Sequence, residues 1–500
     1  MKKRLIYLMI AASIIGVGCS EDFLDPVRDT TELTTAEIAE NAEFNPALIE
    51  GSLEGIYSYM VEPFAVTGAG GSHYDFGHKS IDIWSDILSG DMALTANGYG
   101  WYQNTANLVS TVDYTRAENR IVWTYLYKTV VTANEVIATL GGNDAQPTAQ
   151  ASRHMLGQAK ALRAYAYFYL TQLFQRSYDP SQPILPFYNG VAEETVIGKA
   201  PASQIYGLIV DDLSDAIIFL DDFNRSFKHQ INKTVAQGLL AYTYAAMGEY
   251  GQAKVLADAV IASGAPLTTT GQLAFPGAGS GFNDVNTASW IWGYDLTTEM
   301  GHQLVDWWGQ IDYYTFSYAW AGDRKGIDSA LFAAIPANDI RKSQFGTSGI
   351  TNYMPINKFF HPGRTAGGQQ AITTDLVYMR VEEFYLLSAE AAAKTGDDSS
   401  AKTTLKLLLE NRLGGAANAA TYVDPLSGQA LKDAIYLQTR IEMWGEGKSY
   451  LAMKRNQATV TRGSNHLFRA GQSFSYASDE LSFQIPRTEM DNNPNITDQN

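Results

Sequence analysis

Aromatic and amide side chains gather in two glycine-rich segments of the chain. The first segment, residues 68–107, carries His73, Tyr74, Trp84, Asn97, Tyr99, Trp101, Tyr102 and Asn104. The second segment, residues 268–372, carries Trp307, Trp308, Tyr313, Tyr314, Tyr318 and Trp320. Flat amphipathic rings stack well on the faces of sugars, and their polar tips tolerate an exposed position. Because a long loop rich in rings is uncommon and often functional, these segments are the first candidates for ligand contact.

Motifs for catalysis or metal binding do not stand out in the sequence. It contains neither a Gly-x-Ser-x-Gly elbow nor a P-loop, and the histidines form no i, i+4 pair of the kind found on zinc-binding helices. Asp82, Asp86 and Asp91 lie close along the chain but do not follow an EF-hand loop, so calcium is an open alternative rather than the prediction. Abundant carboxylates leave a glycosidase pair open as well, although the strand–helix alternation of a TIM barrel is missing.

The N-terminus has the pattern of an export signal. Basic residues 2–4 precede an apolar stretch, residues 5–15, and small residues lead to Cys19, the only cysteine. A cysteine at the cleavage point predicts a lipoprotein signal over residues 1–18 and acylation of Cys19, which would tie the protein to a membrane by lipid. One departure is Gly16, since the usual motif has leucine three residues before the cysteine.

The charge of the chain excludes one large class of partners. Its formal net charge is -17, so it offers no basic surface to displace counterions from nucleic acid. The same charge disfavours electrostatic adhesion to anionic lipid. Beyond Cys19 the chain has no cysteine and therefore no internal disulfide, so the exported protein must be stabilised by packing.

Helical periodicity dominates the elements that would position the aromatic segments. The apolar spacing predicts helices over residues 116–140, 153–174, 201–220, 232–247, 251–263, 376–412 and 431–455. Two helix pairs, with turns at residues 248–250 and 396–398, share the small-residue spacing of tetratricopeptide units. Alternation over residues 290–294 predicts a strand, and the tail from residue 481 is expected to lie extended over the surface. The expected fold is therefore mainly α, with tetratricopeptide-like pairs supporting a loop-rich subdomain.

The order of several short motifs resembles that of the SusD/RagB family, the surface glycan-binding lipoproteins of Bacteroidetes. Individual motifs are weak, but their order covers nearly the whole chain. The matching segments are Cys19–Asp25, Trp123–Asn134, Gly157–Phe174, Pro183–Pro186, Asp211–Ala216, Arg380–Glu390, Arg440–Gly447, Lys454–Arg455 and Phe483–Asn500. Ser449 and Ala452 stand where the family has arginine and aspartate, so other contacts must replace that ion pair.

The resemblance implies both a fold and a role. It implies four tetratricopeptide-like helix pairs, no cofactor, and a structural role for Arg163, Arg440 and Glu442, which would satisfy one another or backbone groups between helices. Its implied partners are an oligo- or polysaccharide, a SusC-like TonB-dependent transporter that the protein covers as a lid, and outer-membrane lipid through Cys19, on the cell exterior. The expected divisions are a signal at 1–18, an N-terminal region at 19–267 with a ligand loop near 68–107, and a C-terminal region at 268–500 with an aromatic subdomain at 268–372 and helix pairs at 376–455.

Within this framework the candidate ligand-binding rings are those of Trp101, Tyr102, Tyr318 and Trp320, with Asn104 as a hydrogen-bonding partner for sugar hydroxyls. Trp123 and Trp444 lie on predicted helices and are expected in the core. Glycan capture without catalysis is the favoured function. The alternatives are a protein- or peptide-binding scaffold of a transporter complex and a hydrolase.

Overall fold

The computed structural model describes residues 47–190 and 197–500. The predicted signal at 1–18 and the lipidation site Cys19 lie outside the described residues. Residues 49–500 form one compact unit, which holds both aromatic segments. The predicted division of this part of the chain at residue 268 stays a prediction.

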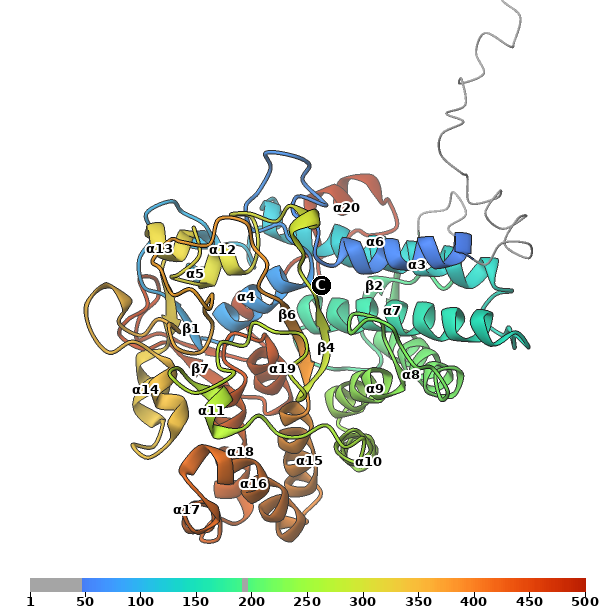
Figure 1. The fold of residues 1–500 in the computed structure, drawn as a ribbon. Helices are drawn as coiled ribbons and strands as arrows, with labels where there is room; N and C mark the ends of the chain where they lie inside the picture. The colour runs from blue at the N-terminus through green and yellow to red at the C-terminus, as the bar shows by residue number, and fades with distance from the viewer. Residues whose placement is uncertain (1–46, 191–196) are drawn as a thin grey trace, which may run out of the picture. The chain divides into compact units, whose positions relative to one another are not determined.

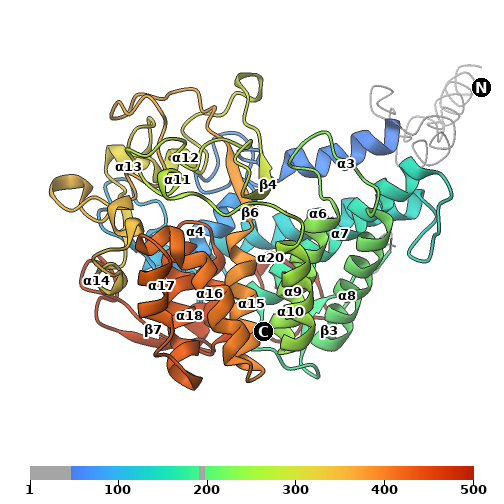
Figure 2. The ribbon, with the colours of Figure 1, turned by 60° about the horizontal axis from the view of Figure 1, so that its bottom comes forward.

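Helices are the main regular structure of this unit, as the sequence predicts, and many of them pack in succession along the chain (Figures 1 and 2). Helix α6 packs on α7, α7 on α8, α8 on α9, α9 on α10, α10 on α15, and α15 on α16. The longer helices are α3 (Ala47–Tyr59), α4 (His78–Leu88), α6 (Ala117–Thr139), α7 (Gln150–Phe174), α8 (Ala202–Phe219), α9 (Lys233–Met247), α10 (Tyr250–Ile261), α15 (Glu382–Lys394), α16 (Asp398–Leu413), α17 (Ala416–Val423), α18 (Gly428–Glu442) and α19 (Lys448–Arg455).

The pair α9–α10 shows how the sequence produces a tetratricopeptide-like unit. The Asn232 side chain accepts a hydrogen bond from the Val235 amide at 3.1 Å and begins α9. Gly248 ends the helix in a left-handed conformation, with φ of 84°, that residues with a Cβ rarely adopt. Ala253 and Ala257 are fully buried, so the helices approach closely. The pair α15–α16 repeats this arrangement, and the predicted helix pairs are confirmed.

Strands are short and occur as four antiparallel pairs among the described residues. They are β1 (Met92–Leu94) with β5 (Lys325–Ile327), β2 (Pro183–Pro186) with β3 (Lys199–Pro201), β4 (Trp290–Tyr294) with β6 (Leu376–Arg380), and β7 (Thr459–Thr461) with β8 (Ser473–Ser475).

The short helices are α5 (Gln103–Ala106), α11 (Thr270–Leu273), α12 (Trp308–Ile311), α13 (Tyr318–Ala321), α14 (Ser329–Ala334) and α20 (Arg487–Asn492), with 3-10 turns η2 (Thr298–Met300), η3 (Ile340–Gln344), η4 (Gly349–Thr351) and η5 (Asp479–Leu481).

Two sequence-based predictions of local structure are wrong. Residues 376–380 were predicted as the start of a helix but form β6, because they pair with the predicted strand β4 across the unit. The tail does not lie extended over the surface throughout. Phe483 and Ile485 are fully buried, and α20 follows them. In both cases a partner distant in sequence decides the conformation.

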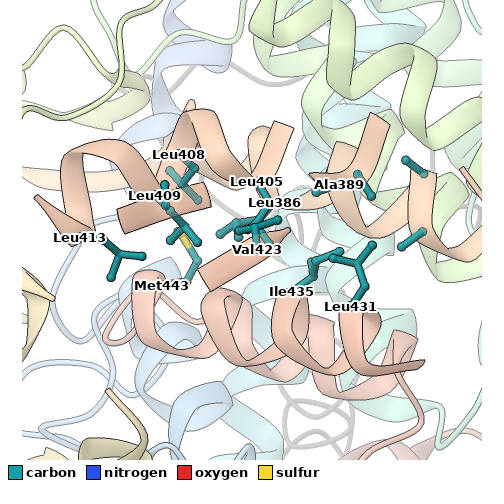
Figure 3. Packing of buried hydrophobic residues seen from close by; sticks show 14 residues of the cluster. Leu386, Ala389, Leu405, Leu408, Leu409, Leu413, Val423, Leu431, Ile435 and Met443 are labelled. Atoms are coloured by element: carbon teal, nitrogen blue, oxygen red, sulfur yellow. The ribbon is translucent and has the colours of Figure 1, made fainter. Parts of the chain in front are cut away.

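Apolar packing holds the C-terminal helices together. Figure 3 shows leucines of α15 and α16 meeting Val423 of α17 and Leu431 and Ile435 of α18. These side chains are buried, and each contributes roughly 1.5–3 kcal/mol by leaving water. The cluster therefore fixes the helices whose ends carry the buried charges described next.

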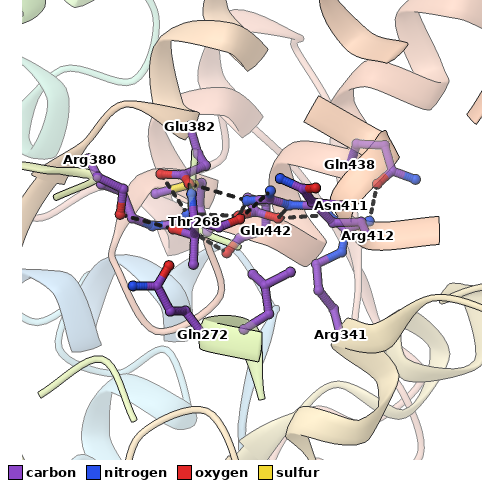
Figure 4. A network of polar contacts seen from close by, with 12 residues as sticks. Thr268, Gln272, Arg341, Arg380, Glu382, Asn411, Arg412, Gln438 and Glu442 are labelled. Carbon is purple, nitrogen blue, oxygen red and sulfur yellow. Dashed lines mark hydrogen bonds and ion pairs between the residues drawn. The ribbon is translucent and has the colours of Figure 1, made fainter. Parts of the chain in front are cut away.

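A fully buried network of charges lies where α16 and α18 meet β6 (Figure 4). Its centre is Glu442, whose carboxylate accepts hydrogen bonds from Arg341, Arg380 and Arg412 at 2.7–2.9 Å. Lys358 is the fourth cation, and the carboxylates of Asp339, Glu382 and Glu446 complete the network, so four positive charges meet four negative ones. The predicted structural role of Glu442 is confirmed, but its partners are not Arg163 and Arg440, which pair with Asp212 and Asp91.

Candidate functional site

The two aromatic segments are brought together by backbone pairing. Beyond the β1–β5 ladder, the Thr95 amide donates to the Arg324 carbonyl at 2.7 Å, and the Arg324 amide donates to the Ala96 carbonyl at 3.0 Å. The Gly98 amide then donates to the carbonyl of Gly322 at 3.2 Å. The loop after β1 therefore runs beside α13, although more than 200 residues separate them in the sequence.

A buried carboxylate fixes the end of this loop. Asp323 directs one oxygen at the Tyr99 amide, 2.6 Å away, and the other at the Trp101 amide, 2.9 Å away. Hydrogen bonds to a charged acceptor are stronger than neutral ones, and Asp323 has no exposed surface. The side chain thus holds two ring-bearing residues in place from the opposite segment.

Replacing Asp323 by asparagine is expected to loosen the loop without unfolding the protein. The amide offers one acceptor oxygen and points an NH₂ group at an N–H donor, so one of the two hydrogen bonds is lost. We expect amide hydrogen exchange at residues 97–103 to accelerate about tenfold, equivalent to ~1.4 kcal/mol of local stability. Exchange measured in helix α7 is the internal control. Unchanged exchange at residues 97–103 would show that Asp323 does not hold the loop.

Four rings form a connected set that we call the Trp101 cluster: His73, Tyr99, Trp101 and Tyr318. The Trp101 indole stacks on His73, with ring centres 4.8 Å apart and planes 6° from parallel. The Tyr318 hydroxyl lies 2.7 Å from Nδ1 of His73, and its ring meets Tyr99 edge to face at 5.3 Å. Burial lowers the pKa of His73, so the imidazole is neutral and serves as a flat support. Tyr99 is 61% exposed, and Trp101 is half-buried.

The second exposed surface is the Trp320 pair, formed by Phe316 and Trp320. Trp320 is 37% exposed, and its ring centre lies 5.7 Å from that of Phe316. Its indole rests on Gly367, where an added Cβ would come within 2.7 Å of the ring. Gly367 also has φ of 65°, so glycine suits this position in two ways. Backbone therefore supports the indole, and the exposed part of the ring is available for contact.

An arginine anchors the loop that carries Gly367. The Arg364 guanidinium lies over the rings of Phe275, Tyr314 and Phe360, 3.8–4.5 Å from their centres. It also donates to the Ile356 carbonyl at 2.8 Å. Cation–π contacts of this kind contribute about 0.5–2 kcal/mol each, so the support beneath Trp320 is fixed in position.

The structure corrects one predicted ligand contact, that of Tyr102. Tyr102 is only 1% exposed because its left-handed backbone, with φ of 64°, turns the ring toward Tyr74 and Trp84 in the core. It therefore cannot stack on a ligand. Asn104 is half-buried, and one N–H of its side-chain amide donates to Glu118 at 3.1 Å, so the contact of Asn104 with a ligand stays a prediction.

The remaining predicted rings fall into two places. Trp101 and Tyr318 lie in contact, with Tyr318 only 7% exposed, so that it supports the Trp101 cluster from below. Trp320 follows Tyr318 by two residues on the single turn of α13, and side chains so spaced point to different sides of a helix. The Trp101 cluster and the Trp320 pair thus flank α13.

Sequence reasoning missed Tyr99 and Phe316 as exposed rings. Tyr99 stands between Gly98 and Gly100, and glycines have no side chain to cover a neighbouring ring. This sequence feature could have predicted that Tyr99 is exposed. Phe316 carries no such signal. Its exposure follows from the pairing of its amide with the Gln369 carbonyl, at 2.7 Å, on a loop 53 residues further on.

The acidic residues considered for calcium are committed to other contacts. Asp82 pairs with Lys79 at 2.5 Å, Asp86 accepts the Gly445 amide at 2.7 Å, and Asp91 pairs with Arg440 at 2.6 Å. Throughout residues 47–190 and 197–500, no three His, Cys, Asp or Glu side chains are arranged to hold a metal ion.

This mainly helical platform with surface rings matches a defined class of proteins. A family model described as the SusD family matches residues 337–500, and one described as "Starch-binding associating with outer membrane" matches residues 71–245. Together the two segments cover more than half of the chain, which belongs to the SusD/RagB family. No curated protein matches the chain significantly. No helix within the described part of the chain is both long and apolar enough to span a membrane.

Solved structures share the fold over nearly their whole length. A SusD-like carbohydrate binding protein from Bacteroides vulgatus is 24% identical, with a TM-score of 0.73 over 90% of this chain and 96% of that chain. A SusD superfamily protein from Bacteroides thetaiotaomicron is 21% identical, with a TM-score of 0.72 over 90% and 98%. The surface glycan-binding protein A from the same species is 16% identical, with a TM-score of 0.65 over 89% and 96%.

Proposed function

We propose that this protein captures glycans by stacking sugar rings on the Trp101 cluster and the Trp320 pair. The observation that carries the proposal is the Trp320 indole, which has one face supported by Gly367 and is 37% exposed. Because the two ring surfaces flank a helix turn about 10 Å across, a ligand that touches both must be an oligo- or polysaccharide. The family description as starch-binding supports the same class of ligand.

The proposal includes a location and a route. The protein is a lipoprotein acylated at Cys19, anchored in the outer membrane and facing the cell exterior, and it passes glycan to a SusC-like TonB-dependent transporter. The description of the matched family as associating with the outer membrane supports this location. Capture proceeds without cleavage, so incubation with glycans should release no new reducing ends.

The test is affinity electrophoresis through gels containing starch, xylan, pectin, dextran or arabinogalactan. The parent protein is expected to be retarded by at least one polymer, and Trp320→Ala to lose about 5- to 30-fold in affinity because a stacked ring contributes about 1–2 kcal/mol including its buried area. Trp320→Phe should retain part of the affinity. Tyr114→Ala is the matched control, since Tyr114 is 38% exposed but lies in neither ring surface.

Two results would contradict the proposal. One is a parent protein that binds none of the polymers, which would favour a peptide-binding scaffold. The other is release of reducing ends from a bound polymer, which would indicate a hydrolase.

A further inference from the structure

A second set of stacked rings lies away from α13, between α8 and α9. The His229 imidazole is sandwiched between Tyr294 of β4, at 4.7 Å and 21° between planes, and Phe227, at 5.4 Å and 5°. Tyr294 is buried, His229 is half-buried, and Phe227 is 58% exposed. The three rings therefore form a column whose inner end is in the core and whose outer end reaches solvent.

Hydrogen bonds fix this column in place. Nε2 of His229 lies 3.0 Å from Glu54, and the Trp292 indole donates to the His229 carbonyl at 2.6 Å. Arg225 donates to the carbonyls of Lys228, Gln230 and Ile291. A segment held by so many side-chain contacts loses little conformational freedom when a ligand binds.

The outer face of Phe227 is a surface without an evident structural purpose. One face of the ring packs on His229. The rest of the ring is exposed to solvent, where it makes no contribution to the packing of the column. The Glu54 carboxylate stands beside the column with its side chain 36% exposed, and it can accept a hydrogen bond from a hydroxyl group. A flat apolar face next to a hydrogen-bond acceptor has the chemistry that one face of a pyranose ring requires.

We propose that Phe227, supported by His229 and Tyr294, is a second sugar-stacking site that binds the same glycan as the site at α13. This inference rests on the proposed function, since it assumes that the ligand is a glycan. The two sites share no residue. In Figure 2 the chain between α8 and α9 rises beyond the ends of these helices, on the side of the unit that also holds α12 and α13. Two weak sites on one side raise affinity for a polymer by making the second contact intramolecular.

The test uses the same five polysaccharide gels with the full-length protein and the variants Phe227→Ala, Phe227→Trp and Tyr114→Ala. For the polymer that retards the parent, Phe227→Ala is expected to weaken binding roughly 3- to 10-fold, the effect of one stacked ring. Phe227→Trp should bind at least as tightly as the parent, which a merely misfolded variant would not do. Tyr114→Ala should match the parent.

The outcomes separate this inference from the proposed function. If Trp320→Ala weakens binding while Phe227→Ala binds within twofold of the parent, the second site is disproved and the first one stands. If Phe227→Trp binds as weakly as Phe227→Ala, the ring at this position is not a stacking surface. If the parent protein binds no polymer, the proposed function fails, and this inference fails with it.

Discussion

Replacing Glu442 by glutamine is expected to destabilise the protein by about 3–5 kcal/mol, because it leaves one buried positive charge without a partner. Burial alone would raise the pKa of Glu442, but Arg412, Arg380 and Arg341 hold it well below its usual range. The carboxylate is therefore ionised in the fold at all ordinary pH values. The substitution keeps the size of the side chain and removes only the charge that balances the network.

The measurement is urea unfolding of the parent and Glu442→Gln at pH 7, followed by circular dichroism. The double variant Glu442→Gln/Arg412→Gln restores equal numbers of buried charges and should recover part of the loss. Glu249→Gln, the same change at an exposed position, should have little effect. If Glu442→Gln unfolds at the same urea concentration as the parent, charge balance in the network does not contribute to stability.

The second large effect is expected at Asp86, where replacement by asparagine should stabilise the protein above neutral pH. Asp86 is fully buried on α4, and its Oδ1 has no hydrogen-bond partner in the described structure. Burial raises the pKa of this carboxyl well above its usual range, and the nearby carboxylates of Asp91 and Asp82 raise it further. No described lysine, arginine or histidine forms an ion pair with it. Helix α19, which packs on α4, carries the uncharged Ser449 at the position where the resemblance in sequence implies an arginine.

The sign of the pH dependence follows from this raised pKa. At a pH below the ordinary pKa of a carboxyl group, Asp86 is protonated in both the folded and unfolded states. Its ionisation then does not change the free energy of unfolding. As the pH rises, the unfolded chain releases this proton more readily than the fold does, and stability falls. Asparagine stays neutral, so Asp86→Asn should exceed the parent by about 1–3 kcal/mol at pH 8 and by little at pH 4.

Thermal unfolding of the parent and Asp86→Asn across pH 4–8 measures this difference. The same substitution at Asp211, which is exposed on α8, is the control and should give a constant difference. A stability gap that does not grow with pH would mean that Asp86 is ionised in the fold.

The local parts of this fold are predictable from the sequence because their causes are local. The Asn232 cap and the Gly248 turn delimit α9 within a few residues of the prediction, and the alternation at 290–294 identifies β4. Trp444 is buried as expected, but it lies in the turn between α18 and α19, where the predicted helix over 431–455 is interrupted. Trp123 is buried on α6, as its helical position predicts. In each case neighbouring residues carry enough information to decide the conformation.

The parts that sequence reasoning could not predict depend on distant contacts. Residues 376–380 become a strand only because β4 lies beside them. The Tyr102 ring turns inward through an unusual backbone angle that no pattern at residues 98–104 indicates. Likewise, the indole of Trp320 is supported by Gly367, 47 residues away, and this contact follows from tertiary structure alone.

Asp323 and the backbone pairing around it have a consequence for how specificity can change. Around α13, the exposed rings Tyr99 and Trp101 lie on segment 97–103, and Phe316 and Trp320 lie on segment 316–322. Main-chain hydrogen bonds, which do not depend on ring type, join the first segment to the second and the second to residues 364–369, which carry Gly367. The buried charges around Glu442 lie elsewhere in the fold. The aromatic residues can therefore change between related proteins while the fold stays the same. These segments are suitable positions for engineering a different glycan specificity into the protein.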